Sequence, residues 1–179
     1  VTSPAILAGA FFFASGFVQI VCGIWTMIDN NVYGSVVFLS FDRFFMSLGG
    51  IVSDILNVSS QYKSTEEYNN ALGIYYASWT VVTFILWTAT FKGTLPIFIF
   101  NQNVFIFMML YTIATFSNRE SIKVAAGVFC FLSSFSGYYA LYDGLHFAAN
   151  SYTPLPESKW FRMPGSWDIH VFLRGIPLG

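Results

Sequence analysis

Five long apolar stretches with almost no charged residues are the feature that most constrains the fold of this chain of 179 residues. A helix rises about 1.5 Å per residue, so roughly 20 apolar residues cross the hydrocarbon core of a bilayer, which is ~30 Å thick. The stretches lie at about residues 4–28, 32–56, 71–91, 95–116 and 122–149. We therefore expect an all-α fold, a polytopic membrane helix bundle with five spans.

The composition agrees with lipid as the main solvent of the chain. Hydrophobic residues make up 55% of it and charged residues only 9%, whereas a soluble domain carries roughly 25% charged residues. The net charge is −1 and no cluster of lysines or arginines occurs, which excludes a groove for the phosphates of nucleic acid. The expected partner is the lipid bilayer, and nucleic acid is not expected.

The end of the chain differs from the rest. We expect one membrane domain over residues 1–153 and a cytosolic tail over residues 154–179, because the tail contains "TPLPESKW" and no evident span. Lysines and arginines are slightly more numerous on the side of the tail, which is the cytosolic side by the positive-inside rule. The chain starts with Val1 inside an apolar stretch, so we expect it to be a fragment of a longer protein.

Two charged residues, Asp42 and Arg43, interrupt the second apolar stretch. They come about ten residues into the span, which is roughly 15 Å and near mid-bilayer. A charge there costs at least roughly 2.5–3.5 kcal/mol, so each side chain should face a partner or a cavity. One interpretation is an interhelical ion pair or a broken helix. The other is a water-filled path in which Arg43 attracts a carboxylate and Asp42 carries a proton.

Further polar residues recur at depth in the other spans. They include Gln19, the run at residues 101–103, and Ser133, Ser134 and Ser136. Any one of them is explained by packing and hydrogen bonding between membrane helices. Because polar residues occur at depth in four of the five spans, we favour a lined pathway.

No pattern for catalysis or for cofactor binding appears. A phosphate loop, a zinc motif with two histidines, a nucleophile elbow and a CxxC pair are all missing. Asp143 and His146 have a spacing that also occurs in relay and metal sites, but no third ligand accompanies them, and a pair at a helix end is more often an interfacial anchor. We expect no enzyme, no cofactor and no metal site.

The order of short motifs resembles that of the acetate uptake transporter family, which includes succinate–acetate permeases and fungal relatives. That family shows F-Y-G-G-x-x-Q-x-x-A-G-x-x-E, N-T-F-G, and S-Y-G-x-F-W. Matching residues here are Phe13, Gly16, Gln19, Gly23, Trp25, N-V-Y-G at 31–34, Ser40, Phe41, Phe44 and Phe45. Later stretches, "NALGIYYASWTVVTF" and "TFKGTL", continue the likeness, which covers about residues 10–156.

The resemblance implies a six-helix fold in which the five spans here are the second to the sixth, and the first membrane helix is lacking. It also implies a plasma-membrane protein with both ends in the cytosol, assembled as a homo-oligomer, a hexamer, with a substrate path in each protomer. The narrow aromatic-aliphatic gate of the family falls on Phe41 and Val104.

The chain departs from the family where the gate begins. Asp42 and Arg43 stand where the family has a glycine and a small residue, Phe41 lacks the hydroxyl of the family's tyrosine, and Thr26 replaces a glutamate. Replacing the glycine by Asp42 would narrow or recharge the path, with altered substrate choice or impaired transport as the expected consequences. The loss of the glutamate argues against conventional proton coupling.

From this resemblance we expect a transporter or channel for acetate or a similar small monocarboxylate. Gln19, Ser40 and Asn103 would offer hydrogen bonds, and Arg43 would attract the carboxylate. One alternative is an ammonium or ammonia exporter, in which Asp42 replaces Arg43 as the attracting group. Another is a non-transporting sensor or structural relative whose substituted gate is closed.

Overall fold

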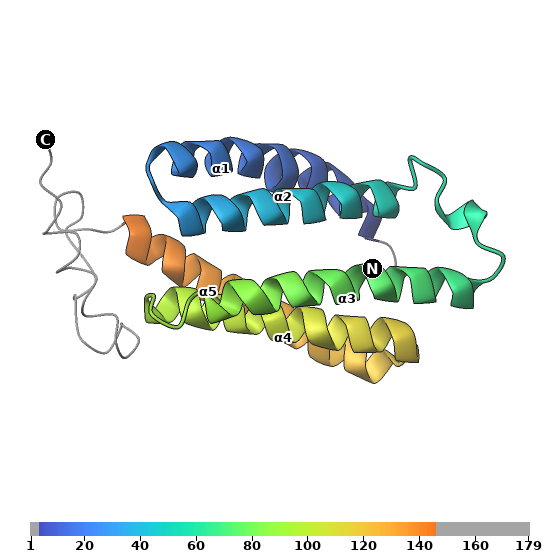
Figure 1. Ribbon diagram of the computed structural model, residues 1–179. Coiled ribbons are helices and arrows are strands. Elements are labelled where there is room, and N and C mark those ends of the chain that lie inside the picture. Colours follow the sequence, from blue (N-terminus) through green and yellow to red (C-terminus); the bar gives the residue numbers. More distant parts are fainter. Residues whose placement is uncertain (1–3, 146–179) are drawn as a thin grey trace, which may run out of the picture. The chain divides into compact units, whose positions relative to one another are not determined.

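The computed structural model describes residues 4–145, and within them the side chains of residues 6–142. The elements are η1 (Pro4–Leu7), η2 (Ala10–Phe17), α1 (Val18–Ile28), α2 (Val32–Ser53), η3 (Ser59–Gln61), α3 (Thr65–Thr88), α4 (Leu95–Ser117) and α5 (Glu120–Leu145) (Figure 1). These described residues contain helices and no strand, which confirms the all-α prediction.

Five of the helical segments are long and apolar enough to cross a membrane. They are Ala10–Ile28, Val32–Ser53, Thr65–Thr88, Leu95–Ser117 and Glu120–Tyr142, with mean hydropathy between 1.3 and 1.8. The first combines a π-helix, η2, with the α-helix α1. The five predicted spans are therefore present as helices.

Several helix ends differ from the predicted boundaries, and at two of them polar residues explain the difference. Helix α2 stops at Ser53, before residue 56, since Asp54 takes a left-handed conformation with φ of 51°. Helix α3 starts at Thr65, six residues before the predicted residue 71. Ser64 Oγ accepts a hydrogen bond from the backbone N–H of Glu67, and the Glu67 carboxylate accepts one from the N–H of Lys63. This is close to a capping box, which starts a helix within polar sequence.

The chain divides into two compact units, Val1–Asn69 and Asn70–Gly179. In the first unit, η2 and α1 run antiparallel to α2 and pack along it (Figure 1). The turn between α1 and α2 is tight: Asn30 is left-handed with φ of 57°, and Asn31 Oδ1 caps α2 by accepting a hydrogen bond from the Gly34 N–H at 2.9 Å.

Glycines set the separation of the helices in the first unit. A Cβ on Gly16 would lie 2.5 Å from Met46 Cγ, and one on Gly23 would lie 2.7 Å from Leu39 Cγ. At Gly49, a Cβ would come within 3.2 Å of Phe11. Small residues let membrane helices approach closely, so these three positions fix the register of η2 and α1 against α2.

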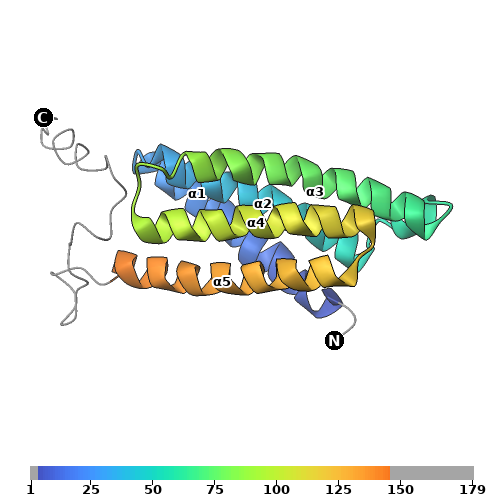
Figure 2. The ribbon, with the colours of Figure 1, turned by 90° about the horizontal axis from the view of Figure 1, so that it is seen from below.

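In the second unit, α4 lies between α3 and α5 (Figure 2). The hydroxyls of Thr80 and Thr112 join α3 to α4 at 2.9 Å. The rings of Trp87 and Phe105 stack between the same helices, with centroids 5.4 Å apart and planes 7° from parallel. On the other side, the ring of Phe100 lies against Gly137 of α5. The second unit is thus held by aromatic packing and one interhelical hydroxyl pair.

Candidate functional site

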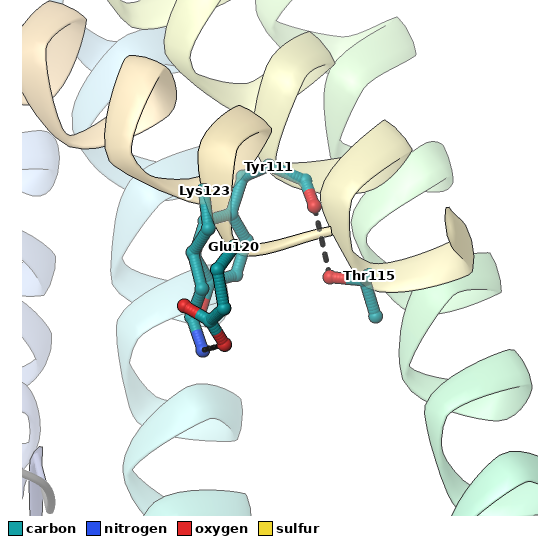
Figure 3. A network of polar contacts seen from close by, with 4 residues as sticks. All are labelled: Tyr111, Thr115, Glu120 and Lys123. Atoms are coloured by element: carbon teal, nitrogen blue, oxygen red, sulfur yellow. Dashed lines mark hydrogen bonds and ion pairs between the residues drawn. The ribbon is translucent and has the colours of Figure 1, made fainter. Parts of the chain in front are cut away.

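Helix α2 runs unbroken through Asp42 and Arg43, so the interpretation as a broken helix is wrong. Among the described side chains the one ion pair joins Lys123 to Glu120 at 3.8 Å, at the exposed start of α5 (Figure 3). Nearby, Thr115 Oγ1 donates to the Tyr111 carbonyl within α4. Neither charge of α2 takes part in an ion pair within this described set, so the interhelical ion pair is not found there either.

Asp42 and Arg43 have opposite environments. Asp42 is 5% exposed, whereas Arg43 is exposed. Successive residues of a helix point about 100° apart, and the two side chains accordingly leave α2 in different directions. The buried residue is the carboxylate, and an ionised carboxylate is costly to bury without a partner.

Asp42 lies on the face of α2 that packs against α1. Leu39 lies against Gly23 of α1, and Met46 lies against Gly16 of η2. Asp42 follows Leu39 by three residues and precedes Met46 by four, so it shares their face. Its Oδ1 accepts a hydrogen bond from the backbone N–H of Arg43.

Gln19 lies at the same level on the facing side of α1. It follows Gly16 by three residues and precedes Gly23 by four, so it shares the face that meets α2. The antiparallel register that pairs Gly16 with Met46 and Gly23 with Leu39 therefore sets Gln19 at the level of Asp42 and Arg43. Gln19 Oε1 is buried and has no hydrogen-bond partner. Gln19 and Asp42 thus lie at about the same level of the two packed helices.

Phe41 and Ser40 lie on other sides of α2, and both are half-buried. The ring of Phe41 approaches that of Phe45, with centroids 6.3 Å apart, and Phe45 stacks on Phe11 at 5.7 Å. The surroundings of Phe41 within its unit are therefore aromatic.

The predicted site residues of the second unit, Asn103 and Val104, are half-buried on α4. The polar residue most buried on this helix is instead Asn101, 4% exposed, whose Nδ2 donates to the Ile97 carbonyl at 2.9 Å. Asn103 lies two residues on, about 200° around the helix. The sequence could have indicated the burial of Asn101, because Asn101 precedes the apolar Met108 by seven residues. Residues seven apart lie on one face of a helix, and both are buried.

Thr26, at the position of the family's glutamate, turns its hydroxyl to its own helix. Thr26 Oγ1 donates to the carbonyls of Cys22 and Gly23, at 2.9 and 3.0 Å. In the described spans, the remaining carboxylates besides Asp42 belong to the exposed residues Glu66, Glu67 and Glu120 in the first turns of α3 and α5. Asp42 is accordingly the one carboxylate away from a helix end in this part of the chain.

The predictions for Asp143 and His146, and for the tail at residues 154–179, lie outside the described side chains. Where side chains are described, no group of three histidine, cysteine, aspartate or glutamate residues is placed to hold a metal ion. The structure therefore describes the side chains of the seven predicted pathway residues, and the prediction can be compared with it there. Five of these belong to the first unit and two, Asn103 and Val104, to the second.

Comparison with known proteins gives several relatives among fungal proteins. Accumulation of dyads protein 2 of Saccharomyces cerevisiae is 30% identical over 165 residues, which cover 89% of this chain and 58% of that protein. Ammonia transport outward protein 2 of the same yeast is 31% identical over 153 residues, covering 85% and 54%. Acetate permease A of Emericella nidulans is 24% identical over 172 residues, covering 89% and 57%. The chain spans a little over half the length of these relatives.

A solved structure, that of the bacterial acetate channel SatP, has the same fold. Its TM-score is 0.71 at 20% sequence identity, and the match covers 87% of this chain and 85% of that one. Residues 1–162 match the GPR1/FUN34/yaaH family. Two of the yeast relatives are named for outward ammonia transport, the Emericella relative is named an acetate permease, and the solved structure is that of an acetate channel. The resemblance read from the motifs is confirmed: the chain belongs to the GPR1/FUN34/yaaH family.

Proposed function

We propose that the chain forms most of the membrane domain of a transporter or channel for acetate or a similar small monocarboxylate. The observation that carries this proposal is the family match over residues 1–162. A relative named as an acetate permease and the fold shared with an acetate channel support it. Assembly as a hexamer in the plasma membrane is part of the same proposal.

The proposed path narrows at Phe41 of α2 and Val104 of α4. An apolar gate makes full desolvation of an anion costly, so the neutral acid, or an anion briefly compensated by a cation, passes more readily. The aromatic surroundings of Phe41 support an apolar constriction on its side. Hydrogen bonds from Gln19, Ser40 and Asn103 would replace part of the water that the substrate loses.

Arg43 is the group that we assign to attract the carboxylate. Its side chain is exposed and takes part in no ion pair among the described residues, so its charge is available to an anion. The guanidinium also suits a carboxylate, because it can present two parallel N–H donors.

The test is uptake of labelled acetate by vesicles that hold the full-length protein. Replacing Arg43→Ala should raise the half-saturating concentration of acetate about tenfold, which corresponds to about 1.4 kcal/mol. Lys123→Ala removes another exposed cation, at a helix end, and should leave uptake unchanged. Equal affinity and rate for the wild type and Arg43→Ala would remove Arg43 from the mechanism.

Ammonium or ammonia is the second candidate substrate, favoured by the yeast relatives that are named for outward ammonia transport and by the buried carboxylate of Asp42. Competition separates the two candidates. Inhibition of acetate uptake by propionate and not by methylammonium supports the acid, and the reverse pattern supports the cation.

A further inference from the structure

Three aromatic rings form a chain of contacts that ends at the proposed gate residue. Phe11 of η2 stacks on Phe45 of α2, with ring centroids 5.7 Å apart and planes 24° from parallel. Phe45 in turn approaches Phe41, which lies one turn earlier on α2, with centroids 6.3 Å apart and planes at 33°. Among the described residues, Phe45 supplies the one ring contact of Phe41. Whatever holds Phe45 in place therefore also affects the position of the Phe41 ring.

The π-helix η2 explains why Phe11 faces α2. At the end of η2, the backbone N–H of Val18 donates to the carbonyl of Phe13, five residues earlier, and in such a helix residues five apart lie on about the same face. Phe11 precedes Gly16 by five residues, and both meet α2, where Phe11 lies against Gly49. In an α-helix, successive residues turn by about 100°, so Phe11 would point about 140° away from Gly16. The unusual backbone of η2 thus brings the Phe11 ring onto α2.

The place of Phe11 on α2 is closely fitted. A Cβ on Gly49 would lie 3.2 Å from Phe11 Cβ, so a larger residue at Gly49 would press on Phe11. Phe45 precedes Gly49 by one turn, and its ring also contacts that of Phe44, with centroids 5.1 Å apart and planes at 64°. Phe44 is itself 4% exposed. Two rings besides Phe41 therefore hold Phe45, one from η2 and one from α2 itself.

We propose that Phe11 is a positioning residue for the gate: its stack on Phe45 holds the Phe41 ring in the path and so limits the size of the acid that passes. This role rests on the proposed function, in which Phe41 narrows the path. Aromatic pairs attract each other beyond the burial of their surface. Loss of the Phe11 ring therefore frees Phe45 to change its rotamer, and Phe41 then gains the room to turn aside. The path widens although no residue of the gate has changed.

The relative uptake of butyrate and acetate by vesicles with the full-length protein tests this role. Phe11→Leu keeps much of the apolar volume and removes the ring, so it should raise the butyrate-to-acetate ratio about twofold or more. Phe12→Leu is the matched control. Phe12 is the neighbouring half-buried ring of η2 and also lies against Gly49, but among the described residues it makes no ring contact with Phe45. The ratio of Phe12→Leu should equal that of the wild type.

A combination with Phe41→Ala separates positioning of the gate from a general effect on the fold. Because Phe11 acts through the Phe41 ring in this account, Phe11→Leu should change nothing further once that ring is gone. The double variant should therefore have the butyrate-to-acetate ratio of Phe41→Ala alone. A ratio that Phe11→Leu raises by the same factor with and without the Phe41 ring would mean that Phe11 acts independently of Phe41, and would overturn the proposal.

A second variant breaks the same stack from the side of α2. Phe45→Leu should raise the butyrate-to-acetate ratio as Phe11→Leu does, so either variant decides the question where the other fails to fold. A raised ratio in Phe41→Ala, together with a wild-type ratio in Phe11→Leu and Phe45→Leu, would leave the gate standing and overturn the role of Phe11. An unchanged ratio in Phe41→Ala, or no uptake by the wild type, would overturn the gate and the role of Phe11 together.

Discussion

At the scale of single residues, Gly16 decides how closely η2 approaches α2. A methyl group there would lie 2.5 Å from Met46 Cγ and 2.8 Å from the backbone oxygen of Phe11. The side chain of Met46 can bend away, but the backbone oxygen cannot move without displacing the helix. The position of Gln19, three residues on, depends on the same contact.

Gly16→Ala should therefore destabilise the first unit by about 1–3 kcal/mol, the usual cost of overpacking. The measurement is the free energy of unfolding in a denaturing-detergent titration. Gly50→Ala is the control, since no atom lies within 4 Å of its added methyl group, and alanine stabilises a helix by about 0.5–1 kcal/mol relative to glycine. Equal effects of the two substitutions would contradict the account of the helix contact.

At the scale of elements, polar side chains have three roles: some join helices, some end helices, and some line the proposed path. The hydroxyl pair Thr80–Thr112 joins α3 to α4, whereas the hydroxyl of Thr115 bonds only the Tyr111 carbonyl of its own helix. Asp54 ends α2 and organises the loop that follows.

The contribution of the interhelical pair is measurable by a double-mutant cycle on Thr80→Val and Thr112→Val. Hydrogen bonds between membrane helices average about 0.6 kcal/mol in such cycles, and we expect a coupling energy of that size. A cycle on Thr80→Val and Thr115→Val should give no coupling energy, because these two hydroxyls do not bond each other. Strong coupling in both cycles would point to a shift of α4 as a whole.

The loop after α2 should respond to acid. Ser59 Oγ donates to Asp54 Oδ2 at 2.8 Å and the Ser59 N–H donates to Oδ1 at 3.1 Å, and these hydrogen bonds lower the pKa of the Asp54 carboxyl group. A lowered pKa stabilises the folded state at pH values above the ordinary pKa of the carboxyl group. This stabilisation is lost as the pH falls from the ordinary pKa through the lowered one.

Thermal melting of the wild type and of Asp54→Asn, at a series of pH values, checks this expectation. The difference between them should be small at neutral pH, because the site is at the surface, and should vanish as the pH falls below the ordinary range of an aspartate. A difference that grows on acidification has the wrong sign for this explanation.

The elements themselves were largely predictable, because the length of an apolar stretch follows from the thickness of the bilayer. The predicted starts at residues 32 and 95 agree with α2 and α4. The start of α3 was missed because Thr65 and the residues after it are polar, and their capping contacts depend on side-chain geometry. The π-helix of η2 was also missed, since a π-helix differs from an α-helix in backbone hydrogen bonding and not in hydrophobic pattern.

The candidate site was predictable only in part. An intramembrane charge is visible in a sequence, and so Asp42 and Arg43 were identified from the second span alone. Their separation into one buried and one exposed side chain required the register of α2 against α1, which Gly16 and Gly23 set. The burial of Asn101 in place of Asn103 likewise depends on which face of α4 packs inward.

At the scale of the whole molecule, the proposed function needs side chains from both units. Phe41 belongs to the first unit and Val104 to the second, and a gate made by the two is a proposal that selectivity can test. An aromatic ring in a narrow path restricts the size of the acid that passes.

Phe41→Ala should raise the uptake of butyrate relative to acetate several-fold, because the smaller side chain widens the constriction. Phe13→Ala is the control, since the Phe13 side chain is 74% exposed on η2, and it should leave the ratio unchanged. An unaltered butyrate-to-acetate ratio in Phe41→Ala would exclude Phe41 from the gate.

The central claim is that the protein carries a small monocarboxylate across a bilayer. The most direct measurement is the initial rate of labelled acetate uptake by vesicles with the full-length protein, compared with protein-free vesicles at the same pH. The account predicts a rate several-fold above that of the protein-free vesicles, reduced by unlabelled propionate. A rate equal to that of protein-free vesicles, from protein that is folded and assembled, would contradict it and favour a non-transporting sensor or structural role.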